Sequence, residues 1–175
     1  MGAFYNVLAQ TKKDWWLNWD ESTRDSAYLA PNSMITKKWY NVEYFKKDTE
    51  ESYTFYANGT VIHELEYHTE VPLKLTDKGT WKRNKQFLTI VINLGNSVIT
   101  PDKEKFSKLS LRKQDELKTN INEAVREWRK GGTKTYDCQM LRLNKDVLIL
   151  SNKTSLSGKS YFVSPNIYSK LAEDN

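Results

Sequence analysis

Two histidines are the side chains of this chain that could take part in the most kinds of chemistry, as acid, base or metal ligand. His63 and His68 are its only histidines, and they lie five residues apart on one predicted strand. Successive side chains of a strand point to opposite faces, so the two rings do not share a metal ion. The Cys and His spacings typical of zinc sites are also absent. We therefore expect no metal and no cofactor, and we interpret His63 as a hydrogen-bonded interior residue, with contact to a ligand inside a cavity as the alternative.

A pair of carboxylates on the same strand is the second feature that could take part in catalysis. Glu64 and Glu66 share one strand face, an arrangement that suits glycoside hydrolysis at the right separation. The same spacing is typical of a solvated strand face, and we expect both groups in solvent. The chain has no Gly-x-Ser-x-Gly elbow and no glycine-rich phosphate loop. The sequence thus predicts no catalytic residues and a protein that is not an enzyme, with catalysis by Glu64 or Glu66 as the weaker alternative.

Composition narrows the class of protein. With Cys138 alone, no intramolecular disulfide forms, and we expect this thiol to be a small buried side chain. A chain of 175 residues predicts one domain that buries roughly 70% of its unfolded surface. The net charge of +5 is spread along the sequence, which favours solubility over nucleic-acid binding. No apolar run of about 18 residues predicts a membrane-spanning helix.

Short strands separated by turn residues must position these side chains. Asn58-Gly59, between residues 53–56 and 61–67, predicts a β-hairpin with a type I′ turn. Asp77-Lys78-Gly79 predicts another turn, after Pro72 has ended the pairing. Further strands are expected over residues 37–46, 80–83, 87–94, 135–143, 147–151 and 160–164.

The pattern becomes helical after Pro101. Between Ser110, a capping residue, and Gly131-Gly132, apolar residues recur at helical spacing, which predicts an amphipathic helix of about five turns. It lies within an insertion over residues 103–131. We expect it to pack on the sheet or across a barrel mouth through Leu117, Ile121, Val125 and Trp128.

A mainly β fold follows from these elements. An antiparallel meander of about eight strands removes its exposed edges by closing into a small barrel, here with one amphipathic helix before the last three strands. A barrel of this size is filled by side chains or holds one small ligand. We expect a Trp-rich lead segment over 1–35, the barrel over 36–165 and a C-terminal helix or tail over 166–175.

Alternation along the strands assigns the barrel interior. In the second strand of the hairpin the apolar face carries Val61, His63, Leu65 and Tyr67, which we expect inside. An apolar interior with few polar groups fits a pocket that orients a ligand by one hydrogen bond. The predicted ligand-binding residues are Phe55, His63, Leu65, Tyr67, Trp81, Leu88 and Ile90.

The lead segment contains a second candidate site. Trp15, Trp16 and Trp19 lie within five residues of one another. Exposed rings would stack on sugars or sit at a membrane interface, whereas buried rings would close one end of the barrel. We expect burial, and keep an interaction surface for protein or glycan as the alternative.

Four segments carry a family resemblance. They are Trp39-Tyr40, the residues 55–60 (Phe-Tyr-Ala-Asn-Gly-Thr), 79–82 (Gly-Thr-Trp-Lys) and 141–150. Together they resemble the lipocalin-like domains of exported proteins from Bacteroidetes-type bacteria, over about residues 37–163. The resemblance implies a calycin-type barrel in an exported protein, often a lipoprotein, that faces the periplasm or the cell surface. Lys37 departs from the lipocalin signature, which has glycine there, and a cytoplasmic location stays as the alternative.

These features together predict a non-catalytic binding module. Its expected partner is a small apolar or amphipathic ligand inside the barrel. The alternative is a filled barrel that acts as an interaction or structural domain of the cell envelope. Such a domain would dock on protein or glycan through the Trp-rich segment or the helix. An internal cavity distinguishes the two.

Overall fold

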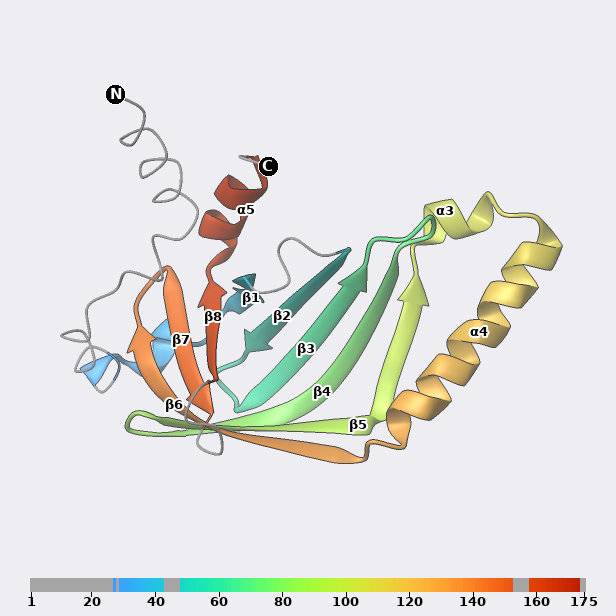
Figure 1. The fold of residues 1–175 in the computed structure, drawn as a ribbon. Coiled ribbons are helices and arrows are strands. Elements are labelled where there is room, and N and C mark those ends of the chain that lie inside the picture. Colours follow the sequence, from blue (N-terminus) through green and yellow to red (C-terminus); the bar gives the residue numbers. More distant parts are fainter. Residues whose placement is uncertain (1–26, 28, 43–47, 153–157, 174–175) are drawn as a thin grey trace, which may run out of the picture.

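The computed structural model describes residues 27, 29–42, 48–152 and 158–173, and within them the chain forms a closed barrel of eight antiparallel strands (Figure 1). Each strand pairs with the next along the chain, and β8 pairs with β1. This confirms the predicted fold class. The strands are β1 (Lys38–Asn41), β2 (Thr49–Phe55), β3 (Thr60–Tyr67), β4 (Leu73–Asn84), β5 (Phe87–Pro101), β6 (Thr133–Leu143), β7 (Val147–Asn152) and β8 (Lys159–Val163).

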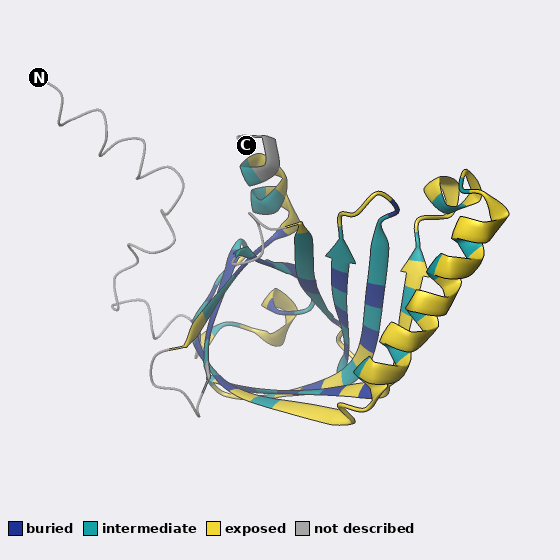
Figure 2. Cartoon of the chain, turned by 45° about the vertical axis from the view of Figure 1, so that its right-hand side comes forward, coloured by how far each residue is buried: buried dark blue, intermediate teal, exposed yellow. Residues whose placement is uncertain are grey.

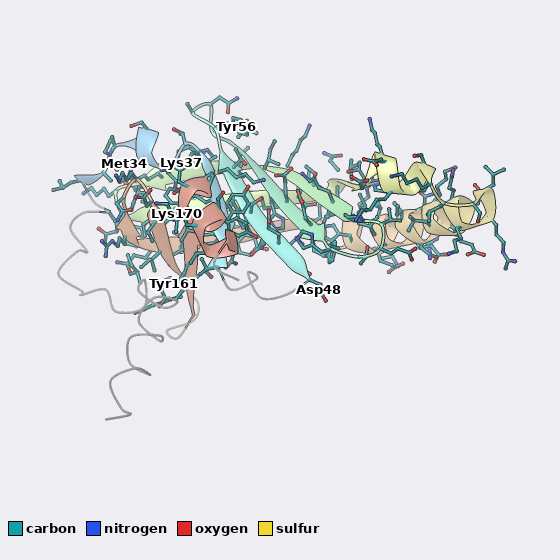
Figure 3. The ribbon with its side chains drawn as sticks, turned by 90° about the horizontal axis from the view of Figure 1, so that it is seen from above. Met34, Lys37, Asp48, Tyr56, Tyr161 and Lys170 are labelled. Atoms are coloured by element: carbon teal, nitrogen blue, oxygen red, sulfur yellow. The ribbon has the colours of Figure 1, made fainter. Side chains whose placement is uncertain are left out.

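The helices lie outside the barrel wall. Helices α3 (Lys103–Ser107) and α4 (Leu111–Arg129) connect β5 to β6, as predicted for the insertion, while η2 (Asn32–Met34) precedes β1 and α5 (Pro165–Glu173) follows β8. Figure 3 shows from above that α5, marked by Lys170, and α4 lie toward opposite ends of the molecule. The predicted cluster Trp15, Trp16 and Trp19 lies outside the described residues.

The barrel closes through a short pairing. Strand β1 meets β8 at Tyr40 opposite Val163 and at Asn41 opposite Phe162. The strand predicted over 37–46 is shorter than expected, since β1 ends at Asn41 and residues 43–47 lie outside the described part.

The hairpin of β2 and β3 forms as predicted, but its turn does not have the type I′ conformation. Gly59 has a φ of +82°, whereas Asn58 has no positive φ. The Gly59 N–H donates to the Tyr56 carbonyl at 3.0 Å, and the Asn58 side chain accepts from the Thr60 N–H at 3.0 Å. A longer loop with one left-handed glycine is the next most common hairpin connection, and it needs a positive φ at one position only.

The turn predicted at Asp77-Lys78-Gly79 is wrong, because β4 continues through these residues. It pairs with β3 on one side and β5 on the other. Gly79 is needed for close approach, since a Cβ there would lie 2.0 Å from the Val91 carbonyl oxygen. Pairing with two long neighbours thus overrides the local turn signal of this tripeptide.

A bulge in β5 faces Asp77. Thr76 pairs with Val98 and Lys78 with Asn93, so residues 94–97 of β5 lie opposite Asp77 alone. Such a bulge bends a strand and re-aims its side chains. Here it brings Ser97 to the Asp77 carboxylate.

Aliphatic side chains form most of the buried core, and four aromatic rings lie among them, those of Trp39, Phe55, Trp81 and Phe162. Trp39 is fully buried and its indole N–H donates to the Ile35 carbonyl at 3.0 Å. The indole N–H of Trp81 donates to the Tyr56 carbonyl at 2.9 Å. Buried residues follow the barrel strands in Figure 2, whereas α4 is largely exposed.

Helix α4 packs one side against the sheet, as predicted. Ser110 caps it, accepting from the Lys113 N–H, and Gly132 follows its end with a φ of +63°. Strand β6 pairs with β5 only from Phe87 to Asn93, and beyond this point α4 lies alongside β5 (Figure 1). The predicted stripe is half-buried rather than fully buried, and it comprises Leu117, Ile121, Val125 and Trp128.

Candidate functional site

A partly enclosed cavity of about 290 Å³ lies inside the barrel. Its walls come from six of the eight strands, and the lining side chains are those that alternate toward the interior. Polar and apolar groups contribute about equally to the surface of the cavity. The lining residues are Asn41, Glu51, Tyr53, Phe55, Ile90, Tyr136, Cys138, Leu148, Leu150, Ser160 and Phe162.

Two of the seven predicted ligand-binding residues line this cavity, Phe55 and Ile90. Trp81 lies one layer behind, with its ring edge-on to Phe55 at 5.7 Å between centroids. Leu88 and Leu65 are buried side chains of the wall and the core. The structure thus places only part of the predicted set of ligand-binding residues at the cavity.

His63 lies beside the cavity and not on its surface. It is buried and opposite Asp77 in the ladder of β3 and β4. Its Nδ1 lies 2.9 Å from Asp77 Oδ2, and its Nε2 lies 3.1 Å from Glu51 Oε1. The ring also stacks on Tyr53 at 4.6 Å between centroids. The interpretation of His63 as a hydrogen-bonded interior residue is confirmed.

The charge of His63 follows from its two carboxylate partners. Burial by itself lowers the pKa of this imidazole, but the hydrogen bonds and charges of Asp77 and Glu51 outweigh it and raise the pKa. Both ring nitrogens then carry a proton and donate, one to each carboxylate. In this form His63 is an imidazolium between two carboxylates, and its raised pKa favours this form.

Asp77, His63 and Glu51 form one hydrogen-bonded network, in which Asp77 lies on the side of His63 away from Glu51. Asp77 is completely buried, yet donors from three elements lower its pKa despite the opposing effect of burial. They are His63, the Ser97 hydroxyl on β5 and the Trp128 indole N–H on α4, the last at 3.2 Å. One carboxylate therefore joins β3, β4, β5 and the end of α4.

Glu51 is the member of the network that reaches the cavity. Burial would raise its pKa, but the bonds from His63, Asn41 and Tyr53 lower it. Tyr53 donates its hydroxyl to Oε1 at 3.3 Å, and the Asn41 amide donates to Oε2. Glu51 thus presents an ionised carboxylate to the cavity, fixed on several sides by hydrogen bonds.

The predicted inward face of β3 agrees with the burial of its residues. Val61, His63 and Leu65 are buried, whereas Tyr67 at the end of the strand is half-buried. On the other face, Glu64 lies 3.0 Å from the Lys38 amine and Glu66 lies 2.5 Å from the Lys74 amine. These two carboxylates stand outside the barrel, away from the cavity and from His63.

Sequence reasoning missed most of the cavity, although a signal for it was present. Glu51 and Tyr53 share the parity of Phe55 on β2, and the same two-residue step relates lining pairs on β6, β7 and β8. Only the order and register of the strands show that these faces meet. The missed residues are Asn41, Glu51, Tyr53, Tyr136, Cys138, Leu148, Leu150, Ser160 and Phe162.

The fold and the cavity define the class of this protein as an eight-stranded antiparallel meander barrel, which is compatible with a lipocalin-like fold. No family model and no curated protein matches the chain. Within the described ranges, no three or more His, Cys, Asp or Glu side chains are grouped to hold a metal ion. No helix in the same ranges has the length and apolar character needed to cross a membrane.

Proposed function

We propose that this protein is a lipocalin-like, non-catalytic binding protein whose barrel holds one small amphipathic ligand. The observation that carries the proposal is the partly enclosed cavity of about 290 Å³ lined by inward-facing side chains. Ligand pockets span about 300 to 1,000 Å³, so this one lies at the small end. With about 30 Å³ per water molecule, it has room for a ligand of roughly ten heavy atoms.

The lining supports an amphipathic ligand. Ile90, Leu148 and Leu150 offer apolar surface, and Glu51 and Ser160 offer polar atoms. Ligand pockets generally combine a mostly apolar wall with a few placed polar groups that fix orientation.

The hydrogen bonding of His63 supports binding rather than catalysis. A general base needs a free nitrogen lone pair within reach of the proton that it removes. Both nitrogens of His63 are engaged by Asp77 and Glu51. The imidazole therefore serves to fix the carboxylates in place.

A cavity-filling variant tests the proposal. Ser160→Trp places a large ring in the cavity, and Val98→Trp on the half-exposed surface of β5 is the matched control. Saturation-transfer NMR would screen neutral, cationic and anionic aromatic molecules of about ten heavy atoms. We expect saturable binding of at least one molecule to the parent and to Val98→Trp, and its loss in a folded Ser160→Trp. A folded parent that binds none of them at millimolar concentration would contradict the proposal.

An interaction domain is the second candidate function, because a groove of about 340 Å³ lies between β5 and α4. Its lining is mixed. Val98, Ile99, Ile121 and Val125 are apolar, and the other lining residues, Ser97, Asn122, Arg126 and Arg129, are polar or charged. Ile121→Asp would alter the groove and leave the barrel cavity intact. If Ile121→Asp fails to complement a deletion strain while Ser160→Trp complements it, the interaction domain is favoured.

The resemblance of the four segments also supports export to the cell envelope as part of the proposal. Fractionation of the source cells, followed by detection of the protein, would test the location. Recovery with periplasmic or surface proteins is expected, and recovery in the cytoplasm would contradict it.

A further inference from the structure

The aromatic lining of the cavity indicates which class of ligand fits, and this inference rests on the proposed function. Four of the lining side chains are aromatic, and the rings of three of them belong to one cluster. Tyr53 meets Phe162 edge-on at 5.7 Å between centroids and lies nearly parallel to Phe55 at 6.3 Å. Tyr136 lines the cavity as well. Aromatic faces carry negative electrostatic potential, which attracts cations.

The charge of the cavity lining also favours a cation over an anion. Among the described residues that line the cavity, Glu51 is the only charged side chain. Behind Glu51, His63 lies between this carboxylate and that of Asp77, so the three side chains retain a net negative charge even when both ring nitrogens are protonated. An anionic ligand head group would meet like charge here, whereas a cation would gain a partner.

We propose that the cavity binds a small organic cation, an alkylated ammonium whose charge lies between the Glu51 carboxylate and the rings of Tyr53 and Phe162. Cages of aromatic rings are the usual means of recognising such groups. The net charge of the whole chain is +5, so long-range attraction does not favour cations. Any preference for a cation must therefore arise inside the cavity.

Three probes of nearly one shape separate charge from size. Choline is the cation, and the alcohol in which carbon replaces its quaternary nitrogen is the neutral analogue. The anion is tert-butylacetate, that is, the carboxylate 3,3-dimethylbutanoate and not the ester. Isothermal titration of the parent at neutral pH would give the three affinities. We expect choline to bind at least about tenfold more tightly than the alcohol, a difference typical of a desolvated cation–aromatic contact. We expect no measurable binding of tert-butylacetate.

Matched variants test whether the preference for choline arises at Glu51 and Tyr53 in the cavity. Glu51→Gln removes the cavity charge at constant size, and Glu66→Gln removes the same charge from the outer face. We expect a roughly tenfold loss of choline affinity in Glu51→Gln and none in Glu66→Gln. Tyr53→Leu should weaken choline more than the alcohol. The comparison of probes on the parent holds even if a variant fails to fold.

The outcomes distinguish this inference from the proposed function. If the alcohol or tert-butylacetate binds the parent as tightly as choline, the cation inference is overturned while ligand binding in the barrel stands. If choline fails to bind but the aromatic panel contains a ligand, the cation inference also falls alone. If no molecule in either set binds, both proposals fail.

Discussion

Asp77 is a completely buried carboxylate that depends on its donors. It receives hydrogen bonds from His63, Ser97 and Trp128, which come from three different elements. A buried charge that loses its partner is strongly destabilising, whereas an exposed ion pair contributes little. The network of Glu51, His63 and Asp77 should therefore matter more for stability than the ion pairs on the outer face.

The first prediction concerns this carboxylate. Asp77→Asn removes the charge that His63 faces, and places an amide where three donors point. We expect the free energy of unfolding to fall by at least about 2 kcal/mol. Urea unfolding measures it, with Glu66→Gln as a control that should change stability by less than about 1 kcal/mol. Equal stability of both variants would show that the network is energetically neutral.

The second prediction is a pH dependence of stability. His63 has a raised pKa in the folded state, so its contribution is present below its ordinary value of about 6.5 and is lost as pH rises through the folded value. Glu51 and Asp77 have lowered pKa values, so their contribution is present above about pH 4.5 and is lost as pH falls through the folded values. The network should thus stabilise the fold most between about pH 4.5 and 6.5.

Unfolding measured across pH in the parent and in His63→Gln checks this dependence. We expect the parent to lose stability above about pH 6.5 more steeply than the variant. Parallel curves for the two proteins would mean that His63 does not carry the charge assigned to it.

At the scale of elements, local signals and long-range pairing had different predictive value. The hairpin at Asn58-Gly59 and the helix after Ser110 were predictable, because a turn dipeptide and a helical apolar period depend on nearby residues only. Asp77 and Gly79 were misread as a turn, because their roles depend on β5, the bulge opposite Asp77 and the carbonyl against Gly79. The cavity was found only in part for the same reason. Its faces meet through strand order and register, which residue alternation does not give.

The third prediction tests the close approach of β4 and β5. Gly79→Ala places a methyl group 2.0 Å from the Val91 carbonyl oxygen, so the strands must separate. We expect a loss of about 1 to 3 kcal/mol, as is typical of overpacking. Gly132→Asn is the control, since no atom lies within 4 Å of its Cβ position and asparagine tolerates its φ of +63°. Thermal unfolding that places Gly79→Ala at or above this control would contradict the close approach.

The fourth prediction concerns the junction of α4 with the barrel. Trp128 is half-buried against the core and donates to Asp77, so Trp128→Ala should cost about 2 kcal/mol or more. Trp128→Phe keeps most of the ring and removes the donor, so it should cost about 1 kcal/mol. Chemical unfolding of both variants gives the order. A midpoint of Trp128→Ala equal to that of the parent would mean that α4 is a solvated appendage.

On the scale of the whole molecule, the barrel and the helical insertion hold two separate hollows, the cavity and the groove. Strands β1 and β8 close the barrel through a short pairing, and α5 packs on the outside of β1, where Tyr168 stacks on Tyr40 at 4.1 Å. Helix α4 covers the far part of β5, which protects a strand edge. The cavity lies within the closed part, and the groove lies between β5 and α4 of the insertion.

The most direct test of ligand binding in the barrel is a methyl NMR titration of the parent with choline. Ile90, Leu148 and Leu150 report on the cavity, and Val98, Ile121 and Val125 report on the groove. Ligand binding in the barrel predicts saturable shifts of the first set, with the second set unchanged. If only the groove methyl groups shift, or if no methyl group shifts with choline or with any of the aromatic molecules at millimolar concentration, the cavity is not a binding site.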